Sequence, residues 1–87
     1  MKGTLTVSGH AADRWRERVD PSLTWDQAAD AIRAFAARGS TRTRPRRWTR
    51  TALAPGDTYV YCADQPLVCL VVAERVVVTV LTPHELP

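Results

Sequence analysis

Cysteine and histidine are scarce in this sequence, which has two residues of each. Cys62 and Cys69 fall in consecutive expected strands, without C-x-x-C spacing and without clustered histidines, so no metal site is recognisable. We expect two buried thiols of a cytosolic protein. A cross-strand disulfide is the alternative if the two cysteines fall opposite each other.

Long apolar runs are also missing. The N-terminus alternates polar and apolar residues and lacks the continuous hydrophobic region of a signal peptide. The apolar stretch from Leu67 to Leu81 is interrupted by Glu74 and Arg75, and it is shorter than the ~20 residues of a spanning helix. We therefore expect a soluble, cytoplasmic protein without a membrane partner.

The chain is short, and its 87 residues predict one domain, 1–87, with a small core. A chain of this length rarely encloses a cofactor pocket. We therefore expect no cofactor, and a function carried by a surface groove.

Charge is unevenly distributed, although the net charge is only +3. Six arginines and no acidic residue lie between Arg38 and Arg50. The rest of the chain carries six basic and nine acidic residues, a net charge of −3. Six like charges within 13 residues repel one another, so the segment predicts a polyanionic partner. A flexible solvated loop is the alternative.

Hydrophobic periodicity predicts an α+β fold, with an N-terminal strand and two helices packed on a four-stranded antiparallel sheet. Ser8 is the expected N-cap of the first helix, and Ser40 to Pro45 is expected to form a loop. The expected strands are Lys2–Val7, Thr58–Ala63, Leu67–Ala73 and Val76–Thr82, the last three forming a meander. Arg46–Thr51 is expected to be a short strand or an extended edge.

The second helix is marked by its ends. Thr24 and Gln27 have the spacing of a capping box, and Gly39 stands where a C-terminal cap belongs. Apolar residues recur between them at intervals of three and four. We expect Trp15 of the first helix and Trp25 of the second to lie in the core.

Three basic residues form a stripe on the first helix. His10, Arg14 and Arg18 are four residues apart, and steps of four drift by only ~40° around a helix. Ala11, Ala12, Trp15 and Val19 gather on the opposite, apolar face. The stripe has the groups that chemistry on a phosphodiester needs. It also has the composition of a solvated helix face whose arginines pair with Asp13, Glu17 or Asp20.

The run His10-Ala11-x-x-Arg14-Trp15-x-x-Arg18-Val19 resembles the opening of small His-Ala-x-x-Arg domains allied to the RelE-like toxins and colicin nucleases. These domains end in a valine-rich strand similar to Val76–Leu81 here. The resemblance implies a RelE-like fold and metal-independent endoribonuclease activity, as in a toxin of a toxin–antitoxin, phage or mobile-element system. A protein antitoxin is then an implied partner.

In the chemistry that the resemblance implies, the ribose 2′-hydroxyl attacks its own phosphate, so the enzyme supplies acid–base and charge-stabilising groups. His10 matches the family histidine, and the helix dipole favours its neutral, proton-accepting form. Arg14 and Arg18 would grip phosphate oxygens. Thr79 matches a hydroxyl position that contacts the phosphate or orients the histidine. Further donors near the sheet end are Tyr59, Tyr61, Thr82 and His84.

The arginine-rich segment, Arg42 to Arg50, is the expected RNA-binding surface. Trp48 within it either stacks on an unpaired base or covers the sheet edge. Lysine is nearly absent, unlike in the best-studied toxins. This difference argues against ribosome-dependent mRNA cleavage in particular, and it leaves open tRNA cleavage or a domain that kept the fold and lost the chemistry. The expected RNA partner is a tRNA, an mRNA or a ribosome-bound RNA. The alternatives are a non-catalytic nucleic-acid-binding or inhibitory module, and a protein–protein module with an acidic partner. The RNA-binding candidates are Arg42, Arg44, Arg46, Arg47, Trp48 and Arg50.

Overall fold

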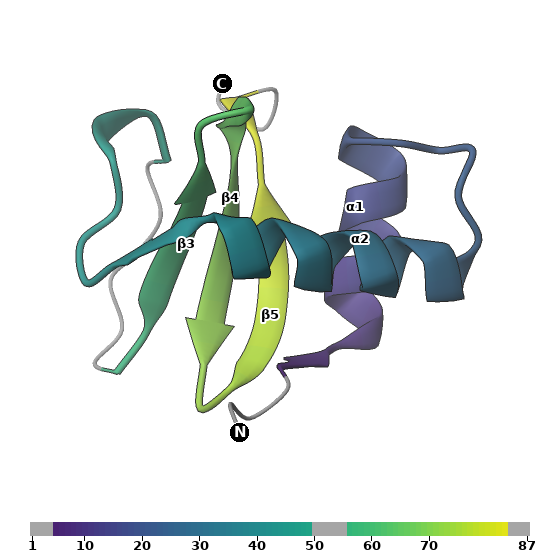
Figure 1. The fold of residues 1–87 in the computed structure, drawn as a ribbon, viewed down its shortest axis with the longest axis horizontal. Helices are drawn as coiled ribbons and strands as arrows, with labels where there is room; N and C mark the ends of the chain where they lie inside the picture. Colours follow the sequence, from purple (N-terminus) through teal and green to yellow (C-terminus); the bar gives the residue numbers. More distant parts are fainter. Residues whose placement is uncertain (1–4, 50–55, 84–87) are drawn as a thin grey trace.

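A computed structural model describes residues 5–49 and 56–83 and shows a mixed α+β architecture, with two helices on a five-stranded sheet (Figure 1). The α+β class predicted from the sequence is confirmed. The helices are α1 (Gly9–Arg18), α2 (Trp25–Arg38) and the short 3₁₀ helix η1 (Arg47–Thr49). The strands are β1 (Thr6–Val7), β2 (Ser40–Arg42), β3 (Thr58–Cys62), β4 (Gln65–Ala73) and β5 (Val76–Leu81).

The strand order is β1-β5-β4-β3-β2, and β1 runs parallel to β5 while all other pairs are antiparallel. The meander of β3, β4 and β5 is confirmed. The expected four-stranded antiparallel sheet is wrong, because the N-terminal strand joins the sheet as an additional, parallel member. Of that strand, Lys2–Thr4 lies outside the described residues.

The segment after α2 departs from its prediction. Ser40–Arg42, expected as a loop, is edge strand β2 and pairs with Tyr59–Tyr61 of β3. The described part of the expected strand Arg46–Thr51 contains the 3₁₀ helix η1 instead. Pro45 lacks the N–H that a strand ladder needs, so it cannot continue the pairing of β2.

Both main helices begin as their sequences predict. The Ser8 side chain accepts a hydrogen bond from the Ala11 N–H at 3.0 Å. Thr24 and Gln27 form both hydrogen bonds of the capping box. Gly39 ends α2 in an extended conformation, and its role is steric. A Cβ there would lie 2.7 Å from the Tyr61 carbonyl oxygen, so only glycine lets α2 end this close to β3.

The sheet separates two apolar clusters. The larger one joins α1 and α2 to one sheet face and includes Trp15, which is 3% exposed and packs edge-on against Phe35. The smaller one lies on the opposite face and contains Tyr59, Tyr61, Cys69 and Val71. Each face of the central strands is therefore covered, as their valine content suggests.

The two cysteines are buried free thiols, as predicted. Cys62 belongs to the helix-side cluster and Cys69 to the cluster on the other face, so the two thiols point to opposite sides of the sheet. This arrangement rules out the alternative of a cross-strand disulfide.

The prediction that Trp25 lies in the core is wrong, since this residue is 42% exposed. Trp25 is the first residue of α2, whose N-terminal end extends away from the sheet (Figure 1). Trp25 stands three and four residues before the buried Ala28 and Ala29, which is the spacing of an apolar helix face. The first turn of α2, however, has no sheet beneath it.

Candidate functional site

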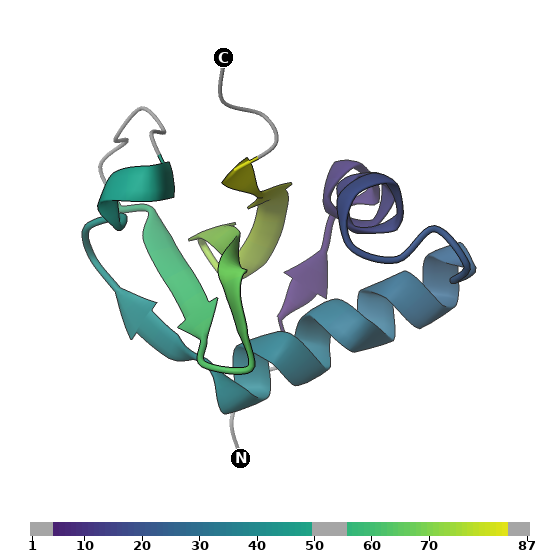
Figure 2. The ribbon, with the colours of Figure 1, turned by 90° about the horizontal axis from the view of Figure 1, so that it is seen from above.

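Helix α1 is docked along the outer edge of β5, where the two-residue β1 ends. The Ser8 N–H donates to the Val77 carbonyl at 3.1 Å, and the Ser8 hydroxyl donates to the Val78 carbonyl at 3.3 Å. The N-cap of α1 is thereby tied to the middle of β5. Figure 2 shows α1 beside the sheet edge, nearly end-on. His10, in the first turn, is consequently held next to β5.

His10 contacts two of the other candidate residues. Its Nε2 lies 3.1 Å from the Thr79 hydroxyl oxygen, and the Arg14 Nε–H donates to the same nitrogen at 3.4 Å. With the ring proton on Nδ1, the single lone pair of Nε2 would be shared by the Arg14 N–H and the Thr79 hydroxyl as donors. The His10 side chain is exposed, so this nitrogen lies at the surface.

β5 carries a bulge beside Thr79, which decides the face of the sheet on which this residue lies. Thr79 pairs with Val71 and Val77 with Val72, which leaves Val78 as an extra residue. Strict alternation from the buried, helix-side Val77 would turn Thr79 toward the helices. The bulge instead places Thr79 opposite Val71, on the sheet face that lies away from the helices.

The two arginines of the stripe also have structural contacts. Arg14 Nη1 lies 2.8 Å from Glu17 Oε2, so the pairing with Glu17 considered from the sequence is present. The Glu17 side chain is 59% exposed, and an exposed ion pair of this kind is weak enough for a phosphate to displace. The Arg18 Nη1–H donates to the Val80 carbonyl at 2.9 Å, which binds the end of α1 to β5.

The arginine-rich segment lies on the same face of the sheet as Thr79. Arg42 pairs with Tyr59, Tyr59 with Val71, and Val71 with Thr79, so one cross-strand row runs from β2 to β5. Directly opposed residues share a face, which places Arg42 at one end of the row and the His10 contact at the other. Three strand spacings separate β2 from β5, about 14 Å.

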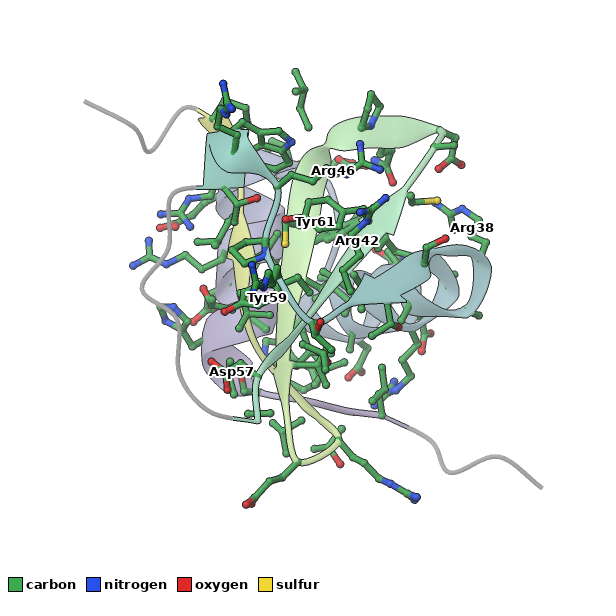
Figure 3. All side chains as sticks on the ribbon, turned by 90° about the vertical axis from the view of Figure 1, so that its left-hand side faces the viewer. Arg38, Arg42, Arg46, Asp57, Tyr59 and Tyr61 are labelled. Atoms are coloured by element: carbon green, nitrogen blue, oxygen red, sulfur yellow. The ribbon has the colours of Figure 1, made fainter. Side chains whose placement is uncertain are left out.

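Arg42, Arg44, Arg46 and Arg47 are all exposed, whereas Arg50 and His84 lie outside the described residues. Figure 3 shows Arg42 and Arg46 with both tyrosines on this side of the sheet. Trp48 is half-buried and packs edge-on against Tyr61, with a ring-centroid distance of 6.0 Å. Trp48 therefore packs on β3 through Tyr61 and keeps part of its surface exposed.

Sequence reasoning missed the binding of this segment by Tyr61, which it named only as a further donor. Alternation in the strand predicts that Tyr59 and Tyr61 share a face. Nothing in the sequence indicates that the segment after β2 folds back over that face. Thr82, another of the further donors, is buried, and the hydroxyl that contacts His10 is that of Thr79.

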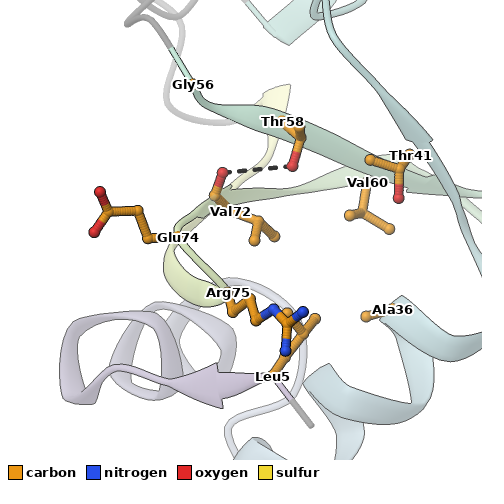
Figure 4. Close-up of a pocket in the computed structure, with 9 residues that line it drawn as sticks. All are labelled: Leu5, Ala36, Thr41, Gly56, Thr58, Val60, Val72, Glu74 and Arg75. Atoms are coloured by element: carbon orange, nitrogen blue, oxygen red, sulfur yellow. Dashed lines mark hydrogen bonds between the residues drawn. The ribbon is translucent and has the colours of Figure 1, made fainter. Parts of the chain in front are cut away.

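A pocket of about 320 Å³ opens on the opposite, helix-bearing side of the sheet (Figure 4). Its only titratable described lining residues are Glu74 and Arg75, and the Glu74 side chain points away from the pocket. The pocket therefore offers no acid–base pair. Its described lining residues are Leu5, Ala36, Thr41, Gly56, Thr58, Val60, Val72, Glu74 and Arg75.

Burial sets the ionisation of the groups beneath the candidate face. Loss of solvent raises the pKa of the Cys69 thiol to about 11, so this thiol is protonated and is no nucleophile at neutral pH. Burial, followed by the charge of Asp57, raises the pKa of Tyr59, and burial also raises that of Tyr61. All three groups are neutral in the folded protein at neutral pH.

These shifts predict that the fold loses stability in alkali. An unfolded chain releases the Cys69 proton near its ordinary pKa of 9.0, whereas the folded chain holds it until about 11. The free energy of unfolding should therefore fall as the pH rises above 9, and urea titrations at several pH values measure this slope. Cys69→Ala should reduce the slope, while an equal slope in this variant and the parent contradicts the assignment.

Within residues 5–49 and 56–83, no three histidine, cysteine or acidic side chains are grouped so that they could hold a metal ion. The same part of the chain contains no helix with the length and apolar character needed to cross a membrane. Comparisons of the chain with protein-family models, with curated proteins and with solved structures found no match.

Proposed function

We propose that this chain is a RelE-like domain that cleaves RNA without a metal ion, as an endoribonuclease toxin. The observation that carries the proposal is the meeting of His10, Thr79 and Arg14, with distances of 3.1 and 3.4 Å at one imidazole nitrogen. These groups lie at one end of the sheet face whose other end carries the arginine-rich segment. Acid–base and phosphate-binding groups therefore lie at the two ends of one face of the sheet.

The reaction uses the RNA's own nucleophile. His10 Nε2 would release its contacts with Thr79 and Arg14 and take the proton of a ribose 2′-hydroxyl, which it would later return to solvent. The 2′-oxygen would attack the adjacent phosphorus. The bond from phosphorus to the 5′-oxygen breaks, and that oxygen leaves with a proton supplied by solvent at this exposed site. The products are a 2′,3′-cyclic phosphate and a 5′-hydroxyl, so no external nucleophile is consumed.

The other residues of the stripe would support this step. Arg14 would exchange its exposed partner Glu17 for a phosphate oxygen and stabilise the charge that builds there. Thr79, within hydrogen-bond distance of the ring nitrogen, would orient His10. Arg18 would add positive charge at the phosphate while it holds α1 against β5.

The partners follow from the same proposal. The substrate would be a tRNA, an mRNA or a ribosome-bound RNA, met in the cytoplasm. A protein antitoxin with an acidic segment would cover the arginine-rich face, since opposite charge favours that surface.

Brief induction of the protein in a bacterial host tests the proposal in cells. We expect growth arrest and discrete new RNA 5′ ends with the parent, and neither with His10→Ala at equal abundance. Sequencing of the 5′ ends also identifies the substrate. New ends that persist in His10→Ala would contradict the role given to the histidine.

A second function, nucleic-acid binding without cleavage, is favoured by a different observation. Glu17 already pairs with Arg14, and Val80 already accepts a hydrogen bond from Arg18, so the stripe has a structural use. This function predicts salt-sensitive RNA binding with no new 5′ ends. His10→Ala would then leave the phenotype unchanged, and loss of Arg46 and Arg47 would abolish it.

A further inference from the structure

Four of the contacts that hold the arginine-rich segment to the sheet converge on Tyr61 of β3. Its hydroxyl oxygen accepts a hydrogen bond from the Arg46 main-chain N–H at 2.6 Å and lies 2.7 Å from the Thr49 hydroxyl. The Arg46 guanidinium lies 4.9 Å from the centre of the Tyr61 ring, and Trp48 packs edge-on against the same ring. The backbone and side chains of three segment residues thus share one anchor.

The segment needs such an anchor because its charges repel each other. Arg42, Arg44, Arg46 and Arg47 form no ion pair with any acidic side chain among residues 5–49 and 56–83. Nor does the segment bury a large apolar surface, since Trp48 is only half-buried. A stretch with this composition would otherwise be extended and mobile.

We infer that Tyr61 is a positioning residue, which orders the arginine-rich segment on the sheet face before RNA arrives. The inference rests on the proposed RNA binding. Ordering a flexible chain at the moment of binding costs conformational entropy, and a preorganised surface avoids that cost. Because Tyr61 is only 4% exposed, it acts through the segment and does not touch the RNA itself.

The same strand supplies a matched control. Tyr59 lies two residues earlier, on the same face, and is 1% exposed. Its buried hydroxyl has no hydrogen-bond partner among the described residues. Tyr59→Phe and Tyr61→Phe therefore delete the same atom from neighbouring positions, and only the second deletion removes hydrogen bonds to the arginine-rich segment.

The test compares both variants with the parent by titrating a fluorescent single-stranded RNA oligonucleotide over a range of salt concentrations. Tyr61→Phe should weaken binding about fivefold to tenfold, the factor expected for one net hydrogen bond. The dependence of affinity on salt should not change, because every arginine still reaches the RNA. Tyr59→Phe should bind as the parent does. Equal affinity of Tyr61→Phe and parent, or a reduced salt dependence, would overturn the inference.

A second pair of variants guards against loss of the fold. Thr49→Val removes the partner hydroxyl at nearly constant volume and should weaken binding, whereas Thr49→Ser should restore it. Parent-like binding by Thr49→Val would count against the anchor.

Hydrogen exchange of the Arg46 amide separates this inference from the proposed function. Tyr61→Phe should remove the protection of that amide, whether or not RNA binds. If the parent binds no RNA, the proposed function fails while this measurement still decides the anchoring role. If the Arg46 amide of Tyr61→Phe exchanges as slowly as that of the parent, the anchoring role of Tyr61 is wrong.

Discussion

Replacing His10 with alanine should slow RNA cleavage by about 10²–10⁴-fold, the usual contribution of a positioned acid or base. The His10 side chain is exposed and takes no part in the core, so the fold should survive the change. Thr79 and Arg14 would keep their backbone positions but lose the nitrogen that both contact. The measurement is the single-turnover cleavage rate of a labelled RNA by purified protein.

The matched control for His10 is Asp13→Ala. Asp13 is another exposed polar residue on α1, and its side chain takes no part in the hydrogen bonds of His10 with Thr79 and Arg14 or in the ion pair of Arg14 with Glu17. The Asp13→Ala variant should cleave RNA at the parent rate and should have the parent's melting temperature. If His10→Ala cleaves RNA as fast as Asp13→Ala, His10 is not the acid or base of the reaction.

The second large effect concerns Arg42, Arg44, Arg46 and Arg47. Replacing all four with glutamine should weaken RNA binding and reduce its salt dependence, because fewer counterions are displaced from the phosphates. For single-stranded RNA, the slope of log affinity against log salt should become shallower by up to about 3. Glutamine keeps much of each side chain's length, so the contact of residue 46 with the Tyr61 ring loses charge more than volume.

Single substitutions on the two sheet faces provide the comparison for that effect. Arg44→Gln removes a charge from the segment, whereas Arg75→Gln removes an equal charge beside the helix-side pocket. The first should reduce the salt slope by about 0.7 and the second should not change it. Equal reductions would mean that RNA is attracted by net charge alone and has no preferred face.

Local signals predicted the helices and the His10 stripe well. Ser8, the capping box at Thr24 and the glycine at position 39 act through hydrogen bonds and contacts within a few residues, so the sequence displays them. The stripe follows from helical geometry alone. Even there, the sequence could not show that Arg18 would reach the Val80 carbonyl, since that contact depends on how α1 docks.

Long-range features could not be predicted in the same way. The face on which Thr79 lies depends on the bulge at Val78, and a one-residue shift in register would reverse it. β2 forms because its three residues find a partner in β3, although they have no strand pattern of their own. Trp25 has the spacing of a core residue but lies where α2 extends away from the sheet.

The most direct measurement of the proposed chemistry uses two RNA oligonucleotides of identical sequence, one of them lacking the 2′-hydroxyl at the cleavage position. The purified protein should cut only the intact ribose strand, leave a 2′,3′-cyclic phosphate, and lose this activity with His10→Ala. Cleavage of both strands, or of neither, would contradict the proposal that the RNA 2′-hydroxyl is the nucleophile and His10 its base.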